Sequence, residues 1–130
     1  MKIMFLIMEK WIPFLLQLQT QTQLWHWQTS TYASHIALGS YYELVQELSD
    51  KFIEVTKGKN LNGAKPELQN ASIEIKGIVG VDLCTQYSMW AKQLIEMSME
   101  ESIASQIEIQ DIILDMINAT HQLVYLLRLK

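Results

Sequence analysis

Two histidines and two acidic residues in the first half of the chain have side chains that suit a metal ion. His26 and His35 are nine positions apart, and Asp50 and Glu54 follow with the spacing of one helical turn. Imidazole nitrogens and carboxylate oxygens together are suitable ligands for iron or zinc. A site of this composition could bind Fe(II) and leave positions open for an oxidant. His121 has no such acidic neighbourhood, and we do not expect it to be a ligand.

A helix over residues 32–56 would orient the two acids. On a wheel of 100° per residue, the apolar side chains fall on one side and the acidic side chains form a narrow strip nearly opposite. The apolar set is Leu38, Tyr41, Val45, Leu48, Phe52 and Val55, and the acidic set is Glu43, Glu47, Asp50 and Glu54. The acids therefore point away from the chain's own core, and ligands that complete their site are expected from a neighbouring subunit. An ordinary solvated amphipathic helix shows the same pattern.

The residues that break helices are concentrated in one stretch. Four of the five glycines and one of the two prolines lie between positions 58 and 80. This distribution predicts a non-helical crossover over 58–80 that separates two helical arms. We expect the helix before it to end at Gly58, with the glycine in a left-handed cap.

Apolar spacing predicts two helices in each arm. Residues recur at intervals of three and four, as one buried helical stripe requires. The stripes are Trp11, Phe14, Leu15, Leu18 and Trp25; Leu83, Tyr87, Trp90, Leu94 and Met97; and Ile109, Ile112 or Ile113, Met116, Ile117, Leu123, Val124 and Leu127. The predicted fold is all-α, a single domain over 1–130 in which two helical hairpins and a crossover form an antiparallel four-helix bundle.

The amino-acid composition indicates that this domain associates with further copies of itself. Of 130 residues, 49% are hydrophobic and only 18% are charged, which predicts a homo-oligomer. The first hairpin has more aromatic side chains than one core stripe needs, so we expect it to form a two-fold interface. These side chains are Trp11, Trp25, Trp27, Tyr32, Tyr41 and Tyr42.

Cys84 is the only cysteine, which excludes a disulfide framework and favours a reducing, cytoplasmic compartment. We interpret Cys84 as a small buried residue.

Charge and hydropathy exclude two further classes of partner. Fourteen acidic residues outnumber ten basic ones, so DNA binding is weak or absent and rests on a few scattered lysines. These are Lys51, Lys57, Lys59, Lys65 and Lys76. The apolar run over residues 3–8 is too short to span a membrane. Residues 1–8 are expected to be a helix start or a leader extension, with Met8 as an alternative initiator.

The order of these residues carries a resemblance. The segment with His26-Trp27, His35, Tyr42-Glu43 and Asp50-Lys-Phe-Ile-Glu54 resembles the signature of the Dps-type miniferritins. The amino-acid sequence of residues 26–59 is closer still to that of a small phage-associated branch of ferritin-like proteins. The end, Tyr125-Leu-Leu-Arg128, is similar to the close of those sequences.

This resemblance implies a ferritin-like bundle that assembles into dimers and dodecameric cages and binds iron. It implies that His26 and His35 of one subunit face Asp50 and Glu54 of its two-fold mate, where Fe(II) could be oxidised. Two departures weigh against this function: the interval between the histidines is shorter than in the family, and Gly39 stands where the family has a further acidic ligand. The alternative is a non-enzymatic ferritin-like assembly or interaction protein that has lost the metal site.

Overall fold

The computed structural model describes residues 2–59 and 70–129, with side chains from Lys10 onward. In these ranges it contains α-helices and no β-strand, which confirms the predicted all-α class. The helices are α1 (Lys2–Gln28), α2 (Tyr32–Lys59), α3 (Leu83–Met99), α4 (Glu101–Ala104) and α5 (Ile107–Arg128). None of the helices in the described part of the chain has the length and apolar character needed to cross a membrane.

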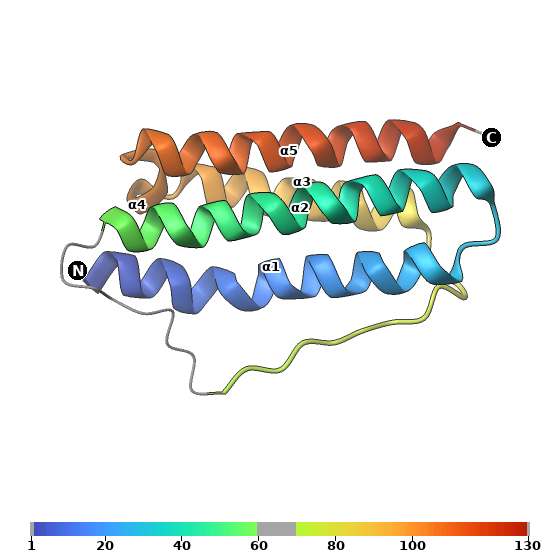
Figure 1. The fold of residues 1–130 in the computed structure, drawn as a ribbon, viewed down its shortest axis with the longest axis horizontal. Coiled ribbons are helices and arrows are strands. Elements are labelled where there is room, and N and C mark those ends of the chain that lie inside the picture. The colour runs from blue at the N-terminus through green and yellow to red at the C-terminus, as the bar shows by residue number, and fades with distance from the viewer. Residues whose placement is uncertain (1, 60–69, 130) are drawn as a thin grey trace.

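Four long helices lie side by side (Figure 1), and α2 packs against α1 on one side and α5 on the other. Helix α5 packs in turn against α3. Helices α1 and α3 are wider apart, and no Cα atoms of their described residues approach within 8 Å. Large side chains fill the space between them: Trp25 stacks on Trp90 with ring centroids 5.7 Å apart, and Tyr87 makes edge contacts with both rings. The arrangement is compatible with the predicted four-helix bundle.

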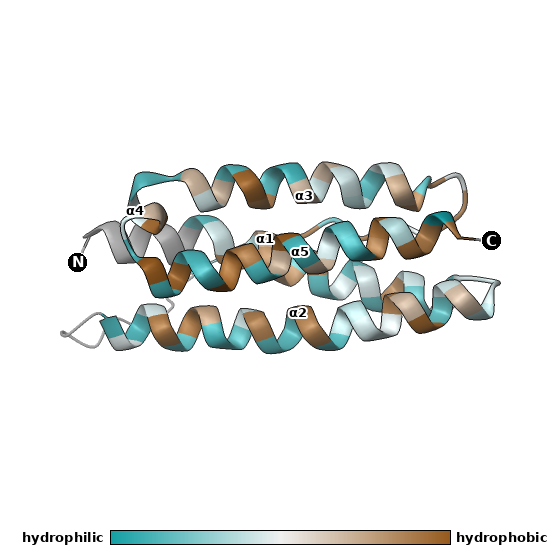
Figure 2. Cartoon of the chain, turned by 90° about the horizontal axis from the view of Figure 1, so that it is seen from above, coloured by the Kyte–Doolittle hydropathy of each residue, from teal (hydrophilic) through white to brown (hydrophobic). Residues whose placement is uncertain are grey.

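The predicted apolar stripes form the core. Hydrophobic and hydrophilic residues alternate around the helices (Figure 2), and the hydrophobic sides meet in two clusters. The cluster near α4 is mainly aliphatic, with Phe52 and Met97 among its buried members. The cluster near the α1–α2 turn is rich in aromatic rings, including Trp25 and Tyr87. Of the predicted stripe residues, Phe14, Val55, Leu83 and Leu127 are only partly buried and pack at the edges.

The connection between α3 and α5 contains the single-turn helix α4, whose Ile103 is fully buried. One local prediction was wrong. Gly58 was expected to cap α2 in a left-handed conformation, but α2 continues through it to Lys59. An ion pair of 2.7 Å between Lys59 Nζ and Glu108 Oε2 joins this last turn to α5.

The aromatic residues of the first hairpin serve the core more than an interface. Trp11, Trp25 and Tyr41 are buried within the chain itself, which corrects the expectation that they lie between subunits. Trp27 and Tyr32 remain on the surface, at 66% and 79% exposure. Tyr42 is half-buried, so Trp27, Tyr32 and part of Tyr42 are accessible to a second copy.

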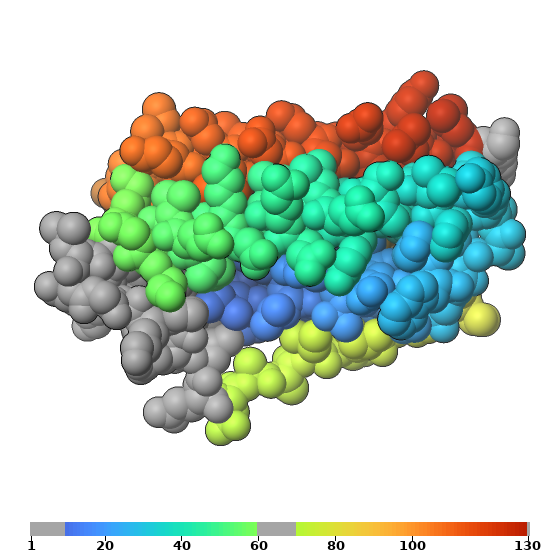
Figure 3. All heavy atoms as spheres, in the orientation of Figure 1, coloured from blue at the N-terminus to red at the C-terminus, as the bar shows by residue number. Residues whose placement is uncertain are grey.

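The crossover runs along the surface of α1. Residues 70–80 follow α1 from its first half towards its C-terminal end (Figure 1) and lie in contact with it (Figure 3). Gln21 binds the segment through two hydrogen bonds to the backbone of Lys76. Its Nε2 donates to the Lys76 carbonyl and its Oε1 accepts from the Lys76 N–H, both at 2.7 Å. The non-helical prediction is confirmed for 70–80, and residues 60–69, with Lys65, lie outside the described residues.

Helix α3 begins after a glycine turn and an acidic cap. Gly80 has a φ of 78°, which glycine adopts without steric cost. Asp82 is the N-cap, and its carboxylate accepts from the N–H and the hydroxyl of Thr85 at 3.3 and 3.0 Å. The bonds from Thr85 hold the pKa of the Asp82 carboxyl below its usual range.

Candidate metal centre

His26 and His35 are brought together at the turn end of the first hairpin. His26 lies in the last turn of α1 and His35 in the first turns of α2, so the short connection places them on facing helices. Their rings stack with centroids 4.0 Å apart and an angle of 15° between the planes. His26 Nδ1 is 2.7 Å from the carbonyl oxygen of His35, and His35 Nδ1 is 2.9 Å from that of His26.

These reciprocal bonds place a hydrogen on Nδ1 of both rings. A backbone carbonyl oxygen only accepts, so each Nδ1 carries the hydrogen and donates it. In the neutral imidazole, Nε2 then holds the free lone pair, which is the form that binds a metal ion. A backbone carbonyl that accepts from the other ring nitrogen is a common way to fix the tautomer and orientation of a metal-binding histidine. When both rings are neutral, the pair therefore has two Nε2 lone pairs on rings whose orientation is fixed within one chain.

Gly39 makes room for this arrangement. A Cβ atom at this position would lie 3.1 Å from His26 Nδ1 and 2.7 Å from His26 Cε1, and the second distance is closer than such atoms approach. The imidazole ring of His26 thus packs directly on the backbone of α2. The sequence suggested that Gly39 replaces an acidic ligand, but the structure shows that any side chain there would displace His26.

A hollow on the outer side of α1 and α2 borders both histidines. Its wall includes Trp27 and Ile36 as well as the polar residues Gln23, Ser40, Tyr42, Glu43 and Gln46. Glu43 is the only acidic residue in this wall, within the described part of the chain. No three His, Cys, Asp or Glu side chains among the described residues gather closely enough to hold a metal ion. A complete coordination sphere at the histidines would need ligands beyond these described residues.

Asp50 and Glu54 lie elsewhere on α2. They follow His35 by more than four helical turns, about 22 to 28 Å along the helix axis, so they do not meet the histidines within one chain. Both are exposed, as the wheel predicted. Asp50 borders a separate, mostly apolar hollow between α1 and α2 beside Ile12, Leu16 and Ser49. In the described residues, neither carboxylate has a hydrogen bond or an ion pair that would fix it.

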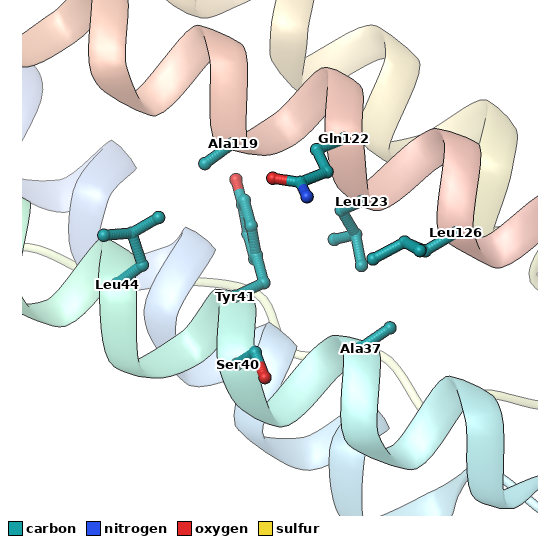
Figure 4. A pocket seen from close by; sticks show the side chains of 8 residues that line it. All are labelled: Ala37, Ser40, Tyr41, Leu44, Ala119, Gln122, Leu123 and Leu126. Atoms are coloured by element: carbon teal, nitrogen blue, oxygen red, sulfur yellow. The ribbon is translucent and has the colours of Figure 1, made fainter.

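The remaining reactive side chains lie apart from the histidines. His121 is exposed on α5. Cys84 is half-buried rather than buried, and its thiol points to the Val124 carbonyl at 4.0 Å. A shallow hollow between α2 and α5 (Figure 4) is lined by small and apolar residues around Tyr41, with the amides and hydroxyls of Gln122 and Ser40 as its polar groups. It contains no histidine or acid.

Two buried tyrosines support the end of the molecule that holds the histidines. Tyr87 donates to Thr22 Oγ1 at 2.7 Å, since that hydroxyl's hydrogen goes to the Leu18 carbonyl. Tyr41 donates in the same way to Thr120 Oγ1 at 2.6 Å. Burial raises the pKa of both phenols far above the usual range, so both stay neutral donors. They fix the core behind α1 and α2.

Sequence reasoning missed the residues that fasten the crossover. Gln17, Gln21, Trp25 and Gln28 all donate to or accept from backbone atoms of residues 74–78. Their spacing of four, four and three places them along one flank of α1. That spacing of glutamines was a visible signal, but amides at such positions are equally common on solvated surfaces.

One family model matches most of the chain. Residues 26–127 match the model of a family described as a family of unknown function, DUF5856. The chain belongs to the DUF5856 family. The matched segment begins at His26 and contains His35, Gly39, Asp50 and Glu54, whereas most of α1 precedes it. No curated protein and no solved structure matches the chain. Membership in DUF5856 does not supply an activity, so the resemblance to Dps-type miniferritins stays a prediction and function has to be argued from the site.

Proposed function

We propose that this DUF5856 protein is a ferritin-like, iron-binding protein with a site shared by two subunits. His26 and His35 of one subunit would supply nitrogen ligands, and Asp50 and Glu54 of the other would supply oxygen ligands. The observation that carries the proposal is the reciprocal bonding of the two Nδ1–H groups, which places the lone pair of each neutral ring on Nε2. Iron is the substrate of this site.

The donor set fits Fe(II). Two imidazoles and two carboxylates combine the nitrogen and oxygen ligands that non-haem iron prefers. In the proposed arrangement, the protein's own residues orient the ion, and the acidic strip on α2 attracts cations to this face. Oxidation of Fe(II) to Fe(III) by peroxide or dioxygen would follow where a coordination position is open.

The exposed positions of Asp50 and Glu54 agree with a shared site. Carboxylates that completed a site within their own chain would face the histidines, whereas these face outward several turns away. In a two-fold dimer with antiparallel α2 helices, the outward strip of one subunit can meet the hairpin end of the other. The exposed Trp27 and Tyr32 flank that end and would be covered.

A second candidate is a DUF5856 assembly protein without metal. It is favoured by the absence of any three-ligand group among the described residues. In this case the stacked histidines would serve only to lock α1 against α2.

Anaerobic Fe(II) titration followed by calorimetry separates the two candidates. We expect saturable binding by the wild type, loss of binding in His26→Ala and unchanged binding in His121→Ala. The His121 control removes an exposed imidazole outside the pair, so it corrects for adventitious binding. Equal Fe(II) binding by His26→Ala and the wild type would contradict the site, and no binding by the wild type would favour the assembly protein.

A further inference from the structure

The crossover segment 71–77 is fastened to α1 along one of its edges. Its bonds fall on alternate residues: Glu74 accepts from Gln17 at 3.2 Å, and Lys76 both donates and accepts. Ile78 continues the series by donating to Gln28 Oε1 at 2.9 Å. In an extended chain, the backbone groups of successive residues point to opposite edges. The groups of residues 74, 76 and 78 therefore face α1.

The opposite edge presents Ile73, Ile75 and Gly77. By the same alternation, their N–H and C=O groups point away from α1. Within the described part of the chain, none of them has a hydrogen-bond partner. All residues from 71 to 77 are exposed, and Figure 3 shows the segment along the surface of the molecule. An extended segment with one row of free backbone groups is a template for pairing with another strand.

We propose that this edge pairs with the same edge of a second copy, antiparallel, about a two-fold axis through Ile75. In this register Glu74 lies directly opposite Lys76 of the second copy, and the symmetry repeats the pair. Opposite charges at facing positions stabilise antiparallel strands, and like charges destabilise them. Ile73 and Ile75, at 36% and 38% exposure, would cover each other on the other face of the ribbon.

Other registers fit less well. An axis through Glu74 or Lys76 would place like charges opposite each other and use the edge already bonded to α1. An axis through Ile73 would place Glu74 opposite Ser72 and leave the charges unpaired. The axis through Ile75 uses every free group of residues 73, 75 and 77 on both copies, about six hydrogen bonds in total.

This interface is separate from the proposed iron site. The crossover segment and α2 lie on opposite sides of α1 (Figure 1), whereas the hollow beside the histidines is lined by residues of α1 and α2 and by none of the crossover. Pairing through residues 73–77 therefore does not depend on whether the protein binds iron.

Cysteine cross-linking in the full chain with Cys84→Ser tests the axis. At the axis, Cα atoms of facing residues are about 5.5 Å apart, within disulfide range. We expect Ile75→Cys to form a covalent dimer at low protein concentration under mild oxidation. Ser72→Cys is the control, because its two copies would be about 20 Å apart. No dimer from Ile75→Cys, or equal yields from both variants, would overturn the proposal.

Charge exchange tests the register in the same background. With Ile75→Cys present, Glu74→Lys alone and Lys76→Glu alone should each slow cross-linking several-fold, because each creates facing like charges. The double exchange Glu74→Lys/Lys76→Glu should restore the original rate. A double variant as slow as the single ones would contradict the register, and circular dichroism of each variant shows whether the helices are intact.

Discussion

The two halves of the proposed iron site differ in how the fold holds them. His26 and His35 are stacked, half-buried and fixed by each other's backbone carbonyls. Asp50 and Glu54 lie on the same helix as His35 but are exposed and unfixed in the described structure. In the proposed site, the nitrogen half is therefore fixed within one chain, whereas the oxygen half would be added only when two subunits meet. Substitutions in the two halves should have different consequences for stability.

The largest effect is expected at the histidine pair. His35→Ala removes the ring stack and the bond from His35 Nδ1 to the His26 carbonyl. We expect a loss of about 1 kcal/mol in the free energy of unfolding together with a fall of about 100-fold or more in Fe(II) affinity. Urea unfolding and Fe(II) titration measure both. Unchanged stability would contradict the structural role of the pair.

Substitution of the two glycines of α2 by alanine should change the stability in opposite directions. Gly39→Ala forces a Cβ onto the ring of His26, so we expect net destabilisation of about 1 kcal/mol, since overpacking outweighs the gain in helix propensity. Gly58→Ala is the control, because a Cβ there meets nothing within 4 Å, and it should stabilise the protein by up to about 1 kcal/mol. Thermal unfolding of both variants compares them. Stabilisation by both substitutions would show that His26 is not seated on Gly39.

Unlike Asp50 and Glu54, Asp82 is fixed by hydrogen bonds from Thr85. Its contribution to stability should therefore depend on pH. Its folded-state pKa is lowered by the bonds from Thr85, so its contribution to stability is present above the unfolded-state pKa and is lost as the pH falls through the folded value. Asp82→Ala should therefore lower Tm at neutral pH and have little effect in strong acid. A Tm difference between Asp82→Ala and the wild type that stays the same at acidic pH would contradict this role.

Asp50 should show the smallest effect on stability. Asp50→Asn removes an exposed charge without a partner in the described residues, so we expect a change within about 0.5 kcal/mol. Its Fe(II) binding should nevertheless fall if the shared site forms. Urea unfolding and Fe(II) titration on the same sample separate the two effects, and a large loss of stability would show that Asp50 has a partner in its own chain.

Sequence patterns were sufficient for the helices and their buried faces. Intervals of three and four placed Tyr87, Leu94 and Met116 in the core, because burial of one helical face leaves a strong periodic signal. The outward direction of Asp50 and Glu54 followed from the same periodicity. These features depend only on spacing along one helix.

Features that depend on contacts between helices were not predictable. The reciprocal bonds of His26 and His35 and the seat at Gly39 arise from the approach of two backbones, which spacing alone does not specify. The sequence therefore suggested a lost ligand at Gly39 where the structure shows space for a ring. Similarly, the excess of aromatic residues suggested an interface, but Trp25 fills the wide gap between α1 and α3.

Complementation between two inactive variants tests the shared site most directly. His26→Ala and Asp50→Asn each damage every site of a symmetric dimer, but a mixed dimer retains one site with both halves intact. We predict that each variant alone has no high-affinity Fe(II) site, and that an equal mixture, unfolded and refolded together, regains about a quarter of the wild-type sites. No recovery in the mixture, with refolding verified by circular dichroism, would contradict a site built from two subunits.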